Sequence, residues 1–207
     1  MQKPLLVGSL VVFAVIAAST QTGHAGVLSF VHACVDNVGD FSQLGARLEA
    51  SGMKEIDPSK GPRSPVGSGS PQQQRLWQTV RLAPGMIDEF TGYNVDSVGF
   101  PAEICFHVSR PGESALVALR ELKNRFSPIG QPFAGTYFSY GGREHWEARI
   151  DGKAVIIGVV WPNKDRPDEG TSQLYLIKAR DSASQHAARV AFLGEALTPR
   201  VRQSRMR

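Results

Sequence analysis

The sequence is poor in the residues and motifs that mark metal sites and catalytic sites. It holds two cysteines among 207 residues, too few for a disulfide-rich miniprotein or a four-cysteine zinc site. It also lacks the Gly-x-Ser-x-Gly, His-Glu-x-x-His, Cys-x-x-Cys, Walker A and Rossmann glycine patterns. We therefore expect no metal and no cofactor, and we favour a protein without catalytic activity.

The excess of basic over acidic residues is confined to the C-terminal end. The net charge is +4, and the last eight residues contain four arginines and no acid: Arg200, Arg202, Arg205 and Arg207. The rest of the chain is therefore neutral overall. A nucleic-acid-binding domain would carry basic residues on a folded face, so we expect no nucleic-acid partner. Residues 199–207 are predicted to be a disordered tail that contacts a membrane at most peripherally.

The N-terminal 25 residues have the three parts of a secretory signal peptide. Lys3 supplies the positive charge, and residues 4–18 form an apolar run that is short of the ~20 residues needed to span a bilayer. Gly23 and Ala25 place small residues at positions −3 and −1 of a cleavage site. We predict cleavage after Ala25 and export to the periplasm or the medium, with a retained membrane anchor as the alternative.

Residues 26–198 are predicted to form a single α+β domain. Apolar periodicity indicates helices near 28–38, after Asp40, at 113–126 and at 181–197. Alternating or continuous apolar runs indicate six strands, at 76–82, 102–109, 136–140, 144–150, 153–161 and 173–178. Tight turns late in the chain favour a curved antiparallel sheet of five or six strands. We expect helix 113–126 to pack on the face of this sheet that carries Phe106.

Residues 57–74 are predicted to be a mobile loop. Fourteen of these eighteen residues are proline, glycine, serine or glutamine, so the segment has little apolar surface to bury. Such a loop is either a lid or recognition element, or an insertion that the fold tolerates. The composition favours the insertion.

Two groups of residues are candidates for a ligand or partner surface. Alternation places His145, Glu147 and Arg149 on one face of a strand, where they would serve acid–base chemistry, bind an anionic ligand or form a solvated face with cross-strand charge pairs. Trp77 and Arg81 indicate an aromatic and basic patch suited to glycans or anionic polymers, unless the tryptophan belongs to the core.

His107 is a third candidate, because it shares a strand face with Cys105. It is interpreted either as a metal ligand or as a half-buried histidine that is bonded to a neighbour, and the second interpretation is favoured.

Two functional hypotheses follow. The first is a non-catalytic interaction module that presents a sheet face or its loop to an envelope protein or an anionic polymer. The second is an envelope hydrolase that uses His145 and Glu147, or His107, as acid–base groups. A pocket in which two of these side chains converge would favour the hydrolase.

Cys34 and Cys105 are predicted to form one structural disulfide. Both follow the signal peptide and would reach an oxidising compartment together. A bridge between them closes a loop of about 70 residues, for which chain entropy gives a stabilisation of roughly 4 kcal/mol. A shared metal site with His32 and His107 is disfavoured, because His32 and Cys34 would point about 200° apart on a helix.

Overall fold

The computed structural model describes residues 25–66, 74–79, 89–96, 98–109, 113–137, 141–167 and 170–194. The predicted signal peptide up to residue 24 and the predicted basic tail lie outside these ranges. The helical segments are α1 (Ala25–Phe30), the π-helical turn η1 (Val31–Val35), η2 (Phe41–Gln43), α2 (Leu44–Ala50), η3 (Pro58–Lys60), α3 (Ala115–Arg125), α4 (Ser182–Ala188) and the π-helical turn η5 (Arg189–Leu193). The strands are β1 (Met53–Ile56), β2 (Gln74–Thr79), β3 (Phe90–Val95), β4 (Ala102–Val108), β5 (Ile129–Tyr137), β6 (Gly141–Ile150), β7 (Lys153–Trp161) and β8 (Gln173–Ala179).

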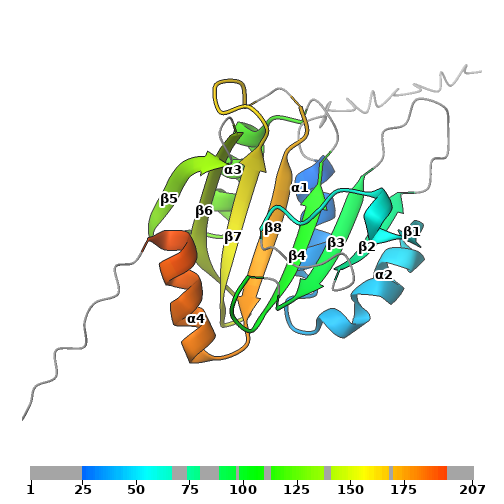
Figure 1. Cartoon of the computed structure of the whole chain (residues 1–207), viewed down its shortest axis with the longest axis horizontal. Coiled ribbons are helices and arrows are strands. Elements are labelled where there is room, and N and C mark those ends of the chain that lie inside the picture. The colour runs from blue at the N-terminus through cyan, green and yellow to red at the C-terminus, as the bar shows by residue number, and fades with distance from the viewer. Residues whose placement is uncertain are drawn as a thin grey trace, which may run out of the picture.

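The described strands form one antiparallel sheet in the order β1-β2-β3-β4-β8-β7-β6-β5. It consists of two four-stranded meanders, β1–β4 and β5–β8, which meet where β4 pairs with β8 (Figure 1). The α+β class and the antiparallel sheet are confirmed, but the predicted five or six strands are too few, because the sheet has eight. The expectation missed β1, which has only four residues, and β3, which has a glycine in its interior.

The glycine in β3 is compatible with a strand because an aromatic ring lies over it. Gly92 pairs with Phe106 of β4, and a Cβ atom at Gly92 would lie 2.1 Å from Phe106 Cζ. Gly158 of β7 repeats the arrangement with Tyr175 of β8, whose Cζ would lie 2.2 Å from a Cβ. The rings cover the bare backbone and supply the packing that glycine lacks.

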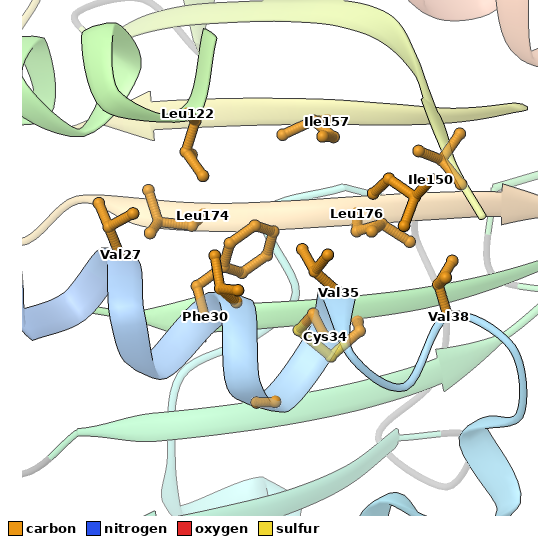
Figure 2. Packing of buried hydrophobic residues seen from close by; sticks show 14 of the residues in the cluster. Val27, Phe30, Cys34, Val35, Val38, Leu122, Ile150, Ile157, Leu174 and Leu176 are labelled. Atoms are coloured by element: carbon orange, nitrogen blue, oxygen red, sulfur yellow. A yellow bond between two sulfur atoms is a disulfide. The ribbon is translucent and has the colours of Figure 1, made fainter. Parts of the chain in front are cut away.

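One face of the sheet is covered by α1, η1, α2 and α3, and we call it the helix face. In Figure 1, α1 and α3 lie behind the sheet. Figure 2 shows Phe30 of α1 and Val35 of η1 directed toward β8, which carries Leu174 and Leu176, and Val38 in the turn that follows η1. Phe30 and Val38 are completely buried, and each fully buried side chain of this size contributes roughly 1.5–3 kcal/mol. The helix face therefore holds the larger part of the core.

The expectation that the third helix packs on the Phe106 face is wrong. Leu119 and Leu122 of α3 belong to the cluster that contains Cys105, whereas Phe106 points to the opposite face. Both faces of β4 are buried, so the strand pattern does not distinguish them. The handedness of the connection from β4 through α3 to β5 does distinguish the two faces. Strands β4 and β5 run parallel, and α3 crosses behind the sheet between them as a right-handed connection, as nearly all such crossovers do (Figure 1).

Helix α3 spans Ala115–Arg125, close to the predicted 113–126. It begins after Ser114, whose hydroxyl accepts a hydrogen bond from Val117 N, and Lys123 and Arg125 lie in its last turn. The apolar periodicity that predicts this helix would turn Leu116, Leu119 and Leu122 inward. Leu119 and Leu122 are buried as expected, but Leu116 is 51% exposed. Alanines 115 and 118 take its place against the sheet, so the buried stripe is shifted by about one position.

The second face of the sheet carries Ile104, Phe106 and Tyr175 and is covered by other parts of the chain. Ala188 of α4 and Phe192 of η5 pack on it, and α4 lies in front of the sheet in Figure 1. The described part of the predicted loop, 57–66, also lies here: Val66 packs on this cluster, and Gln74 Nε2 donates to the Pro62 carbonyl at 3.0 Å. Residues 67–73 of that loop lie outside the described ranges.

The predicted disulfide is confirmed. Cys34 of η1 and Cys105 of β4 are bonded, their Cα atoms are 5.4 Å apart, and neither residue is exposed. The bond joins the first helical segment to the centre of the sheet across 71 residues of sequence. It therefore fixes η1 against β4, next to the cavity described below.

Candidate functional site

The residues predicted as a ligand or partner surface do not lie together. Trp77 is 1% exposed in the core of the helix face, where the Arg75 guanidinium stacks 4.7 Å from its ring. His145 is buried on the opposite face, beside Tyr175 and Phe192. Arg149 is exposed on β6, and Arg81 lies outside the described residues. Trp77 therefore offers no exposed platform for a glycan in this conformation.

His145 holds the C-terminal helical segment on the sheet. Its Nε2 donates a hydrogen bond to the Phe192 carbonyl of η5, and its Nδ1 accepts one from the Tyr175 hydroxyl at 2.9 Å. The ring also stacks on Phe133 with centroids 5.0 Å apart. Burial lowers the pKa of His145 to about 4, although the Phe192 hydrogen bond opposes the shift. The imidazole is therefore neutral at physiological pH, and both of its nitrogens are occupied.

Glu147 anchors the same segment one turn earlier. The carboxylate is 3% exposed and accepts hydrogen bonds from Arg189 Nη2 at 2.8 Å, from Arg189 Nε at 3.0 Å and from Gln185 Nε2 at 2.9 Å. Such a bidentate pair fixes the orientation of both groups. His145 and Glu147 thus bind the chain's own α4 and η5, rather than facing a site that is open to a substrate.

A cavity of about 390 Å³ lies on the helix face between the first helical segment and strands β1–β4. We call it the η1–β4 cavity. The helical side supplies Ser29, His32, Ala33, Asn37, Arg47, Leu48 and Ser51, and the strand side supplies Met53, Thr79, Glu89, Thr91 and His107. His32, Arg47 and Ser51 are exposed, whereas Thr91 and His107 are each 1% exposed. The cavity therefore extends from a polar rim toward a buried polar wall.

The buried wall is formed by a cross-strand pair. Thr91 of β3 and His107 of β4 are register partners, and Thr91 Oγ1 and His107 Nδ1 share a hydrogen bond of 3.1 Å. Strand alternation places His107 on the same face as Cys105, so the disulfide lies directly beside this pair. The hydrogen bond fixes the orientation of the imidazole, as a positioned acid–base or ligand-binding histidine requires.

The opposite wall is formed by the π-helical turn. Asp36 N donates to the Val31 carbonyl at 2.9 Å, which is the wider hydrogen bond that defines a π-turn. Asn37 Nδ2 donates to the carbonyls of His32 and Ala33, at 3.0 Å and 2.8 Å. Asn37 Oδ1 is buried and accepts no hydrogen bond from the described residues. Single π-turns occur frequently at functional sites, because they displace side chains from the regular helical positions.

Sequence reasoning identified His107 but missed its partners. Thr91 lies on an unpredicted strand, and Glu89 precedes it. Asn37 follows a helix whose widened turn has no pattern in the sequence. The signal in the sequence that pointed to this site was the alternation of β4, which puts His107 on the same face as Cys105, two residues earlier. It located the face of the sheet but not the elements that complete the cavity.

In the part of the chain that the structure describes, no group of three or more His, Cys, Asp or Glu side chains is placed to hold a metal ion. Within the same ranges, no helix is long and apolar enough to cross a membrane. The chain matches no protein-family model, no curated protein and no solved structure.

Proposed function

We propose that this protein is an exported, non-catalytic binding module whose ligand site is the η1–β4 cavity. The observation that carries the proposal is the buried Thr91–His107 pair at the cavity wall, opposite Asn37. Polar groups destabilise an apolar core unless they are satisfied, and binding sites place a few such groups at fixed positions in a pocket. A cavity of about 390 Å³ lies within the size range of small-molecule sites.

The lining indicates a small polar ligand that has one apolar side. Serine and threonine hydroxyls and the Arg47 guanidinium offer hydrogen bonds, while Leu48 and Met53 supply an apolar surface. One basic and one acidic side chain, Arg47 and Glu89, line the cavity together. We therefore favour neutral or zwitterionic molecules of the size of an amino acid or a monosaccharide over polyanions.

The disulfide supports a rigid site. It joins η1 to β4, and these two elements form opposite walls of the cavity. Pre-organised walls reduce the entropy that is lost when a ligand binds. We expect reduction of the bond to weaken binding as well as folding.

A cavity-blocking variant tests this function. Ser51→Phe places a ring at the exposed rim, and Ser42→Phe is a matched control on an exposed position outside the cavity lining. Panels of free amino acids and monosaccharides are screened by NMR chemical-shift changes and by calorimetry. A ligand that shifts the Thr91 and His107 signals and is lost in Ser51→Phe, but not in Ser42→Phe, supports the proposal. A ligand that binds Ser51→Phe as tightly as the wild type would overturn the assignment of the site.

A hydrolase that uses His107 is the second candidate. The observation in its favour is that His107 and Glu89 line the same cavity, and that Thr91 holds the imidazole in place. Hydrolysis of a small chromogenic ester by the wild type, lost in His107→Gln with the fold retained, would establish this activity. His145 and Glu147 are not proposed as its catalytic groups, because both bind the C-terminal segment.

A further inference from the structure

The first residue after the predicted cleavage site makes a specific long-range contact. Gly26 N donates a hydrogen bond to Glu113 Oε1 at 3.0 Å, across 87 residues of sequence. Gly26 is buried at the start of α1, and Glu113 lies just before α3. The contact therefore joins the N-terminal end of one helix on the helix face to the start of another.

The space around Gly26 accepts no side chain. A Cβ atom there would lie 2.1 Å from Glu113 Oε2 and 3.0 Å from Ser109 Cβ. Both oxygens of the carboxylate are thus close to this residue, one beside its nitrogen and one beside its Cα. The atoms nearest to such a Cβ belong to Glu113 and Ser109, and of these two residues Glu113 is the charged one.

We propose that cleavage after Ala25 converts the Gly26 nitrogen into an α-ammonium group that forms a structural ion pair with Glu113. Water is split across the Ala25–Gly26 peptide bond: the C–N bond breaks, the hydroxyl adds to the Ala25 carbonyl carbon, and the nitrogen gains the proton. The proposal rests on the proposed export of the chain and not on the function of the η1–β4 cavity.

Cleavage strengthens the contact that is already in place. A peptide nitrogen offers Glu113 one N–H, whereas an ammonium group offers up to three N–H donors and a full positive charge. The hydrogen bond to the carboxylate is already charge-assisted before cleavage, and the ammonium group adds the attraction between two opposite charges. The mature N-terminus then fastens α1 to the loop before α3, whereas an uncleaved chain has only the single neutral donor at this position.

The end group of the exported protein provides the first test. The full chain is produced with its own leader in a bacterial host, and the intact mass of the periplasmic product is measured. A mass that corresponds to residues 26–207 is expected. A product that begins at any other residue overturns the proposal, because the ammonium group would then not be on Gly26.

Reactivity of the terminal amine provides the second test. An α-amine has an ordinary pKa of about 7.7–8.0, and an ion pair raises it, since the charged form is favoured. The rate at which an amine reagent labels Gly26 at pH 7 reports the deprotonated fraction. We expect labelling to be on the order of tenfold slower in the wild type than in Glu113→Gln, which corresponds to one pKa unit. Glu49→Gln, which removes an exposed carboxylate from α2, is the matched control and should label like the wild type.

A titration of the wild type provides a third test, and it does not depend on whether the Glu113→Gln variant folds. The pKa of the Gly26 amine is measured by labelling in the folded protein and in urea. A higher value in the folded protein supports the ion pair. Equal values in the two states, or equal labelling rates in the wild type and in folded Glu113→Gln, would overturn the ion pair, because the free amine of Gly26 would then gain no stabilisation of its charged form from Glu113.

Discussion

Replacement of Gly158 by alanine should destabilise the protein through the aromatic ring that lies over it. The new Cβ would lie 2.2 Å from Tyr175 Cζ and 2.4 Å from its hydroxyl oxygen, so the ring must move. Tyr175 is 1% exposed and has little room to do so. Overpacking of this kind destabilises a core by about 1–3 kcal/mol.

The displacement also reaches the C-terminal segment. The Tyr175 hydroxyl donates to His145 Nδ1, and loss of such a hydrogen bond costs about 1 kcal/mol. Alanine recovers about 0.4–1 kcal/mol by restricting the unfolded chain. The net expectation is a loss of about 1–3.5 kcal/mol in the free energy of unfolding.

Urea denaturation followed by tryptophan fluorescence, with the disulfide intact, measures this loss. Gly39→Ala is the matched control, because the nearest atom to its Cβ, Lys153 Nζ, is 3.7 Å away. The control should differ from the wild type by less than about 0.5 kcal/mol. In a Tyr175→Leu background, Gly158→Ala should lose most of its effect. Equal losses in both backgrounds would refute the steric explanation.

Three further predictions concern the disulfide, His145 and the ion pair between Arg189 and Glu147. Replacing Cys34 and Cys105 by alanine should lower the free energy of unfolding by roughly 4 kcal/mol in urea, and unreduced wild type should show no alkylatable thiol by mass. The folded-state pKa of His145, about 4, lies below the unfolded value of about 6.5, so its contribution is complete above pH 6.5 and is lost as the pH falls toward 4. Denaturation across this range should show a loss of about 3 kcal/mol from that group, and His145→Gln should flatten the dependence. Arg189→Met leaves the Glu147 carboxylate buried with Gln185 as its remaining described partner, and should cost about 2–3 kcal/mol in the same assay, whereas an unchanged midpoint would mean that water replaces the guanidinium.

The sequence predicted the parts of the fold that local patterns determine. The Asp151–Gly152 turn joins β6 and β7 as expected, and both residues have positive φ, as this turn requires. Alternation along β4 correctly placed Cys105 and Phe106 on opposite faces. Strand β3 was missed because its glycine is stabilised by a ring on β4, and a local pattern does not contain that partner.

The site was less accessible to sequence reasoning for the same reason. His145 and Glu147 alternate as polar residues on a solvated strand do, but the partners that bury them come from residues 185–192. The η1–β4 cavity needs a widened helical turn and two strands from separate stretches of the chain. Only the three-dimensional arrangement brings Asn37, Thr91 and His107 to one place.

The position of the disulfide also orders events in time. Both cysteines precede the second meander in the sequence, whereas β8, which pairs with β4 and places Leu176 opposite Cys105, is the last strand of that meander. In a chain that emerges from its N-terminal end, the two thiols are available for oxidation before β8 has arrived. The bond can therefore close while one side of β4 is still an open edge, and open edges are prone to pair with other chains. The first meander is then closed by a covalent bond before the second meander forms. The period between these two steps is when the chain is most prone to aggregate.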